Sequence, residues 1–239
     1  MKNKLMGHFV LGYPTLERSI EIAQEYSQNG VDILECQYPF SDPSADGSII
    51  TEANLVACNY SNKELMDTLK IIANTCKVPI VLMSYITRIH HIGYLNFFKS
   101  CKEMGISTFI LPDIPYDEAI RTELVQTLNG LECTLIPVVS ANTSTERLIE
   151  IDTYHFPFYY VMSYFGTTGN TFSDNPKLIA FIKKLRKISS KEIGIGFGVQ
   201  TREHVSQINS IANFAIMGSE LLKHASSKEQ LLPFLKTLS

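Results

Sequence analysis

The sequence predicts an α/β protein built as a single (β/α)8 barrel, a TIM barrel, with residues 1–239 forming one domain. Hydrophobic runs of strand length alternate with segments of helical periodicity along the whole chain, which gives eight strand–helix pairs. The expected strands are apolar throughout, as in a parallel sheet that is covered on both faces. Eight such pairs in a chain of 239 residues fit a barrel, because an open doubly wound sheet usually has fewer strands.

Each expected element has a local signal. The expected strands are His8–Leu11, Val31–Glu35, Val78–Tyr85, Ser107–Asp113, Cys133–Ser140, Phe158–Ser163, Glu192–Gly198 and Asn213–Gly218. The expected helices are Thr15–Gly30, Ser61–Cys76, Tyr94–Gly105, Tyr116–Asn129, Ser144–Thr153, Pro176–Ile188, Thr201–Ile208 and Ser219–Leu238. The second helix has the clearest start, since Ser61 and Glu64 form a capping box.

Composition excludes several classes of protein. Charged residues make up 19% of the chain and hydrophobic residues 45%, which rules out a disordered protein. The formal net charge of −3 predicts no binding to nucleic acid or to an anionic membrane. No apolar run approaches the roughly 20 residues that span a bilayer. The N-terminal segment contains no signal-peptide cleavage site, and the five cysteines are scattered, so we expect a cytoplasmic protein with reduced thiols.

The barrel predicts where the site lies, because active sites of this fold lie at the carboxyl ends of the strands. The polar residues at expected strand ends are Glu35, Tyr85, Asp113, Ser140, Ser163, Gly198 and Ser219. The longest loops follow the second strand, from Cys36 to about Tyr60, and the sixth, from Tyr164 to Asn175. Loops this long on a compact barrel are usually functional.

Glycines at the last two strand ends predict a phosphate site. Gly198 and the Gly218-Ser219 pair let backbone N–H groups approach an anion, and Gly169 in the long sixth loop can close over the same group. The loops after strands seven and eight are the common phosphate site of this fold. Tight turns without a ligand are the alternative explanation of these glycines.

Carboxylates around the second strand are the candidate catalytic groups. Glu35 at the strand end can project into the barrel mouth and exchange protons, and Asp42 and Asp46 follow it in the loop. Asp42 before a proline fits a turn residue, and Asp46 before a glycine fits either role. No lysine lies within a strand for Schiff-base chemistry, and the histidines are not clustered, so we expect no metal.

The run from Glu35 to Gly47 resembles the signature of the tryptophan synthase alpha chain family. It retains the leading Glu35, the run Pro-Phe-Ser-Asp-Pro at residues 39–43, and Ala-Asp-Gly at residues 45–47. Gly-Tyr-Pro at 12–14, Pro-Asp-Ile-Pro at 112–115, Gly-Thr-Thr-Gly at 166–169 and the late glycines extend the resemblance along nearly the whole chain.

The resemblance implies retro-aldol cleavage of indole-3-glycerol phosphate to indole and glyceraldehyde 3-phosphate. Glu35 matches the proton shuttle of the family, and Asp46 matches the carboxylate that accepts a hydrogen bond from the indole N–H. The residues that match the indole pocket and its closing loop are Tyr85, Tyr160, Thr168 and Phe197. The residues that match the phosphate site are Gly169, Gly198, Gly218 and Ser219.

The resemblance also implies a partner. The family's alpha chain docks on a beta chain in an αββα heterotetramer and activates it allosterically. Residues 39–60 would supply much of that interface. Pyridoxal phosphate is expected only on the beta chain, and this chain is expected to carry no cofactor.

Five positions depart from the family pattern. Gln37 stands in place of glycine, Ser48 of proline, Tyr164 of arginine, Thr87 of asparagine and His8 of phenylalanine. These departures leave open a second interpretation, an impaired alpha-like subunit that mainly binds and activates the beta chain. A third, a sugar-phosphate epimerase or isomerase, explains the phosphate glycines but not residues 39–47.

Overall fold

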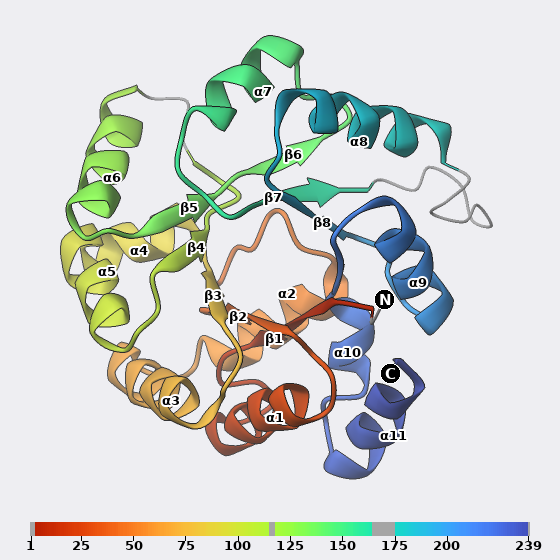
Figure 1. Cartoon of the computed structure of the whole chain (residues 1–239). Coiled ribbons are helices and arrows are strands. Elements are labelled where there is room, and N and C mark those ends of the chain that lie inside the picture. The colour runs from red at the N-terminus through yellow and green to blue at the C-terminus, as the bar shows by residue number, and fades with distance from the viewer. Residues whose placement is uncertain (1–2, 115–117, 164–174, 239) are drawn as a thin grey trace.

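A computed structural model describes residues 3–114, 118–163 and 175–238, and the predicted barrel is confirmed. Figure 1 shows the strands in a ring with helices around the outside. The strands are β1 (Leu5–Val10), β2 (Ile33–Gln37), β3 (Ile80–Met83), β4 (Thr108–Ile110), β5 (Thr134–Ile136), β6 (Val138–Ser140), β7 (Phe158–Met162), β8 (Glu192–Gly196) and β9 (Phe214–Met217). All paired neighbours are parallel, in the order β5-β4-β3-β2-β1-β9-β8-β7-β6.

The ninth strand arises from a break at Pro137. The fifth strand was expected to run unbroken from Cys133 to Ser140, but it is divided into β5 and β6, which flank the proline. Proline has no N–H to donate to a ladder. β5 pairs with β4 on one side and β6 with β7 on the other, so the two halves together occupy the fifth position of the barrel.

The helices agree with the prediction in most places. They are α1 (Leu16–Gln28), α2 (Ser48–Ala57), α3 (Asn62–Thr75), α4 (Ile86–Ile92), α5 (Tyr94–Glu103), α6 (Glu118–Gly130), α7 (Thr145–Asp152), α8 (Pro176–Ile188), α9 (Arg202–Ile211), α10 (Ser219–Lys223) and α11 (Lys228–Leu238). The capping box of α3 is confirmed, because the Ser61 side chain accepts from Glu64 N–H and the Glu64 side chain accepts from Ser61 N–H.

Three helical assignments from the sequence were wrong. Two helices, α2 and α4, lie in segments for which no helix was expected. The last helix, expected over Ser219–Leu238, consists of α10 and α11. All three errors concern short helices whose apolar faces pack on neighbours, and a short segment carries little periodic signal of its own.

The register between β1 and β2 determines which side chains lie together at the barrel mouth. β2 continues to Gln37, two residues beyond the predicted end at Glu35. His8 lies opposite Glu35 and Val10 opposite Gln37 in the parallel ladder. Because residues two apart on a strand point to the same face, Glu35 and Gln37 project together with His8 from the neighbouring strand.

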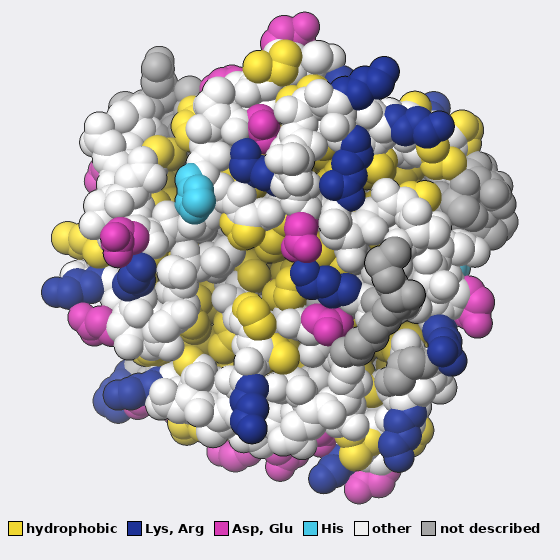
Figure 2. All heavy atoms as spheres, in the orientation of Figure 1, with side chains coloured by type: hydrophobic (Ala, Val, Ile, Leu, Met, Phe, Trp, Pro, Cys, Tyr) yellow, Lys and Arg dark blue, Asp and Glu magenta, His cyan; other side chains and the backbone are white. Residues whose placement is uncertain are grey.

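The surface agrees with the charge balance of the sequence. Figure 2 shows Lys and Arg interspersed with Asp and Glu on the face in view, around a central depression with hydrophobic side chains. None of the five cysteines is in a disulfide. In the described part of the chain, no helix has both the length and the apolar character to cross a bilayer.

The packing of β8 on β9 yields a test of the barrel. A Cβ atom at Gly194 would lie 2.6 Å from Cζ of Phe214 and 3.0 Å from Cδ1 of Ile216. Gly194→Ala must therefore displace a buried ring. We expect the free energy of unfolding to fall by about 1–3 kcal/mol, measured by chemical denaturation. Gly130→Ala on α6 is the control, since nothing lies within 4 Å of its Cβ position. Equal stability of both variants would contradict the packing described here.

Candidate functional site

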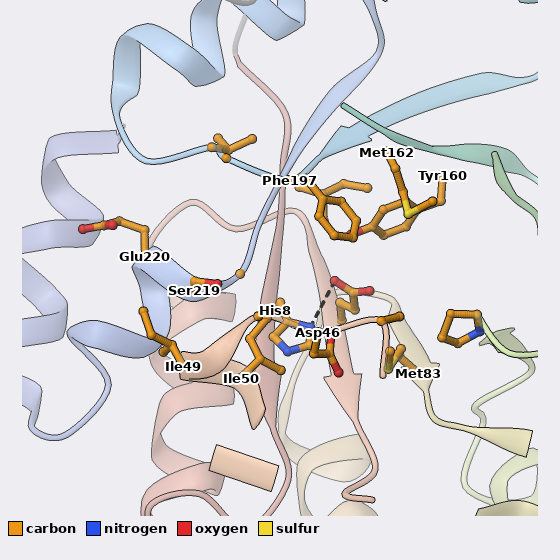
Figure 3. A pocket seen from close by; sticks show the side chains of 18 of the residues that line it. His8, Asp46, Ile49, Ile50, Met83, Tyr160, Met162, Phe197, Ser219 and Glu220 are labelled. Atoms are coloured by element: carbon orange, nitrogen blue, oxygen red, sulfur yellow. Dashed lines mark ion pairs between the residues drawn. The ribbon is translucent and has the colours of Figure 1, made fainter. Parts of the chain in front are cut away.

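A cavity of about 300 Å³ lies at the carboxyl ends of the strands. Its wall comes from segments far apart in the sequence: β1, β2, the loop that leads into α2, β7, and the segments after β8 and β9. Figure 3 shows His8 and Asp46 side by side near the centre, with Tyr160, Met162 and Phe197 on one side and Ser219 and Glu220 on another. The lining contains both candidate carboxylates, Glu35 and Asp46.

Glu35 is buried in the mouth of the barrel and pairs with a histidine. Its side chain comes from β2, and Nδ1 of His8 lies 3.2 Å from its Oε2 (dashed line in Figure 3). Both residues are only 4% exposed. A buried charge is costly unless it is paired, so this contact compensates the burial of Glu35.

Asp46 is held by two donors on one oxygen. Nε2 of Gln37 donates to its Oδ2 at 2.8 Å, and the Tyr85 hydroxyl donates to the same atom at 2.8 Å. The Tyr85 hydroxyl in turn accepts from the N–H of Ala45 at 3.1 Å, which ties the ring to the loop backbone. Both side-chain donors use Oδ2, so Oδ1 remains as the acceptor that Asp46 can offer to a ligand.

The loop that carries Asp46 is anchored on α2. Oδ1 of the buried Asn54 accepts from Phe40 N–H at 3.0 Å, and its Nδ2 donates to Ile50 O at 2.8 Å. The ring of Phe40 packs against Tyr85 with 5.3 Å between centroids. These contacts fix the start of the loop on α2, which matters because small displacements of a reacting group cost rate.

Burial and charge shift the acid–base behaviour of the cavity. Burial raises the pKa of Asp46, and the charge of Glu35 adds to this, while the charge of His8 and the bonds from Gln37 and Tyr85 act in the opposite direction. For His8, burial lowers the pKa, but the hydrogen bond and charge of Glu35, with Asp46 and Gln37, outweigh it, so its pKa is raised. Burial beside two carboxylates raises the pKa of Tyr160 well above its ordinary range.

An aromatic wall faces the carboxylates. The rings of Tyr160 and Phe197 meet edge to face, with centroids 6.3 Å apart. Phe197 has a φ of +72°, a left-handed conformation that costs free energy in a residue with a side chain. The Ser163 hydroxyl hydrogen-bonds the carbonyl groups of Gly196 and Phe197 at 2.6 and 2.9 Å, which supports this backbone.

The opposite end of the cavity carries backbone suited to an anion. Gly198, with φ of +81°, lines the cavity after β8, and Gly218 and Ser219 line it after β9. Ser219 begins α10, where the first N–H groups have no intrahelical acceptor. Lys223, which sequence analysis missed, also lines the cavity and pairs with Glu220 at 2.7 Å. Its spacing of four residues from Ser219 on one helix was the available signal.

Not every predicted site residue lies in the cavity wall. Tyr85 was expected beside the indole pocket, but it is fully buried and supports Asp46 from behind. Asp113 accepts from Ile86 N–H at 2.8 Å at the start of α4, and Asp42 is exposed. Thr168 and Gly169 lie outside the described residues. Among the residues that the structure describes, no group of three His, Cys, Asp or Glu could hold a metal ion.

The fold and the cavity define a class of protein: a (β/α)8 barrel with two carboxylates, Glu35 and Asp46, in a cavity at the carboxyl ends of its strands. A sequence model described as tryptophan synthase alpha chain matches residues 1–233. The chain therefore belongs to the tryptophan synthase alpha chain family, whose members are lyases of tryptophan biosynthesis.

Individual relatives agree with this assignment. The chain is 31% identical over 239 residues to the tryptophan synthase alpha chain of Staphylococcus aureus, covering 98% of this chain and 97% of that protein. It is 35% identical over 228 residues to the tryptophan synthase of Saccharomyces cerevisiae, covering 92% of this chain but only 32% of that longer protein. The solved tryptophan synthase subunit alpha of Campylobacter jejuni is 27% identical, with a TM-score of 0.88, covering 100% of this chain and 96% of that one.

The Tyr85 hydrogen bond yields a test of the Asp46 environment. This bond favours the ionised carboxylate, so Tyr85→Phe should raise the pKa of Asp46 further, as followed by ¹³C NMR titration of the side-chain carboxyl. Tyr159→Phe is the matched control, since its hydroxyl donates to Asp152 instead, at 3.0 Å. A titration of Asp46 that is the same in the two variants would show that Tyr85 does not support it.

Proposed function

We propose that this protein cleaves indole-3-glycerol phosphate to indole and glyceraldehyde 3-phosphate by a retro-aldol reaction. The observation that carries the proposal is that Glu35 and Asp46 line one cavity that has an aromatic wall at one side and glycine backbone at another. Each part of the substrate has a counterpart of suitable chemistry in this cavity.

Glu35 is proposed as the proton shuttle. Carbon 3 of the indole must gain a proton, and the adjacent glycerol hydroxyl must lose one while the carbon–carbon bond breaks. A single carboxylate can serve both transfers if it lies between the two atoms. Oε2 of Glu35 faces His8, so Oε1 is the oxygen that can meet the substrate.

Asp46 is proposed to stabilise the charge that develops on the ring nitrogen. With Oδ2 occupied by Gln37 and Tyr85, Oδ1 can accept a hydrogen bond from the indole N–H. A group that is held in place before the reaction stabilises the transition state at little reorganisation cost. Tyr160 and Phe197 are proposed to enclose the indole ring, Tyr85 to act through Asp46, and Thr168 to close over the site.

The phosphate is proposed to bind the backbone at Gly198, Gly218 and Ser219, with Gly169 completing the site. Backbone N–H groups at a helix start suit an anion, and Lys223 places a positive charge nearby. The chain itself is proposed to need no cofactor.

A beta chain is the proposed partner, in an αββα heterotetramer in the cytoplasm. It would carry the pyridoxal phosphate and be activated by this chain. The proposed docking segment, residues 39–60, supports this with two large apolar side chains on α2, Leu55 and Val56, which are 52% and 39% exposed. Exposed apolar groups on one short helix suit a protein interface.

An impaired subunit is not favoured by the geometry. Gln37 could have disturbed the loop that carries the carboxylates, but its amide instead holds Asp46 in the cavity. Both carboxylates are present and supported, so the cavity retains the groups that the reaction requires.

Replacement of the proton shuttle tests the reaction. Glu35→Gln keeps the shape of the side chain but cannot exchange the proton, so kcat/KM for indole release should fall by about 10²–10⁴-fold. Binding to the beta chain, measured by calorimetry, should be unchanged. Glu103→Gln, on the exposed face of α5, is the control and should retain full activity. Normal cleavage by Glu35→Gln would overturn the assigned role.

Replacement of Gly218 tests the phosphate site. A valine here finds room beside Ile50 and His8, whose atoms lie 3.5 and 3.6 Å from the Cβ position, but covers the neighbouring backbone. The dissociation constant for glyceraldehyde 3-phosphate should rise at least tenfold, or about 1.4 kcal/mol. Gly130→Val on α6 should leave it unchanged. Equal affinities in both variants would place the phosphate elsewhere.

A further inference from the structure

Two of the departures from the family pattern contact the carboxylates of the cavity. His8, where the family commonly has phenylalanine, lines the cavity and contacts Glu35, and Gln37, where the signature has glycine, contacts Asp46. β1 and β2 place them on one face of the sheet through the register of His8 with Glu35. Each residue contacts one carboxylate: Nδ1 of His8 lies 3.2 Å from Oε2 of Glu35, and Nε2 of Gln37 lies 2.8 Å from Oδ2 of Asp46.

Asp46 determines which way the Gln37 amide faces. An ionised carboxylate only accepts hydrogen bonds, so the NH₂ group of Gln37 must face Asp46, as observed. Oε1 of Gln37 is then directed away from Asp46. This buried oxygen finds no hydrogen-bond donor within the described residues, and the same is true of the buried Nε2 of His8.

These two atoms have complementary chemistry. The register of β1 and β2 places His8 and Gln37 on one face of the sheet, and Gln37 favours the charged form of the imidazole, which raises the pKa of His8. An amide oxygen can only accept, so Nε2 of His8 must carry a proton to satisfy it. Nδ1 must also carry a proton, because it faces Oε2 of Glu35. A histidine that donates from both nitrogens is an imidazolium cation.

We propose that His8 and Gln37 form a hydrogen-bonded bridge between the two carboxylates, in which His8 holds the proton that Glu35 delivers to the substrate. The inference rests on the proposed cleavage reaction for its chemical meaning. The bridge runs from Glu35 to His8, then to Gln37, and ends at Asp46. His8 is a positioning residue in this scheme, since it acts through Glu35.

The proton balance closes over one reaction cycle. The Nδ1 proton of His8 moves to Oε2 of Glu35, a turn of the carboxyl group brings this proton to the substrate side, and Glu35 then protonates carbon 3 of the indole. As the carbon–carbon bond breaks, its electron pair returns to the indole ring, and the glycerol hydroxyl becomes the aldehyde and gives its proton to Glu35. That proton returns to Nδ1 of His8. One proton leaves the pair and one enters it.

The surroundings of His8 support its charged state. The charged groups that act on it are carboxylates, Glu35 from β2 and Asp46 from the loop, and these, together with Gln37, raise its pKa despite burial. Tyr160 from β7 lines the same cavity, and burial beside Glu35 and Asp46 raises its pKa, so it remains neutral. On the α10 side, the charges of Glu220 and Lys223 are paired with each other.

The protonation state of His8 tests the bridge without any turnover. We expect ¹⁵N NMR of the free chain to show both imidazole nitrogens of His8 protonated at pH 7. Glu35→Gln and Gln37→Met should each move the midpoint of this titration to lower pH, because each removes an acceptor. His90→Phe, on the exposed side of α4, is the control and should leave it unchanged. A neutral His8 at pH 7 in the unmodified chain would overturn the bridge.

The pH profile of cleavage tests the proton reserve. His8→Phe restores the residue common in the family, and His8→Gln keeps a hydrogen-bond donor but has no group that titrates. Both should move the alkaline limb of kcat/KM to lower pH by at least about one unit, which is tenfold in rate on that limb. Adding Gln37→Met to His8→Phe should move the alkaline limb little further, because either change already breaks the bridge. If the alkaline limb of kcat/KM does not move, His8 only fills space in the cavity and holds no proton for the reaction.

The two experiments separate this inference from the proposed function. If the unmodified chain releases no indole with its beta chain while the NMR titration follows the expected course, the bridge stands and the reaction assignment fails. If indole is released but His8 is neutral, or if the alkaline limb is insensitive to His8, the reaction stands and the bridge fails.

Discussion

The site depends on the burial of one carboxylate. Glu35 lies almost out of contact with solvent in the barrel mouth, and a lone buried carboxylate would either destabilise the fold or take up a proton. The parallel register of β1 and β2 places His8 directly across from it, and the pair at 3.2 Å compensates both burials. Any change that breaks this pair leaves an uncompensated group in the barrel, so stability and chemistry depend on the same contact.

The barrel explains how distant segments meet around this pair. Strand ends that are far apart in the chain open onto one cavity, and the loops that follow them supply the remaining parts. The loop before α2 carries Asp46 and is fixed by the buried Asn54, while the segment after β8 carries Phe197 in a left-handed conformation. The sheet is thus a rigid support for the loops that carry Asp46 and Phe197, and these loops need not contribute to the core.

The sequence was sufficient to predict the barrel. Buried strands appear in it as short apolar runs, and the helices between them appear as apolar residues with helical spacing. It was also sufficient to select Glu35, Asp46 and the late glycines as candidates. It did not reveal that Pro137 divides the fifth strand into β5 and β6. It also did not reveal α2 and α4, whose existence depends on packing against neighbours. The His8–Glu35 pair was equally invisible, since it arises from register between strands that lie 27 residues apart. His8 and Gln37 stood out only as isolated departures, and their contacts with Glu35 and Asp46 could not be predicted from the local sequence.

The central claim, cleavage in this cavity, is tested most directly by indole release from indole-3-glycerol phosphate. The purified chain should be assayed alone and with its beta chain, beside a parallel assay of beta activity from indole and serine. We expect indole to appear and its rate of release to rise when the beta chain is present. An absence of indole from a folded chain that still binds and activates the beta chain would contradict the central claim, and would assign the barrel a regulatory role.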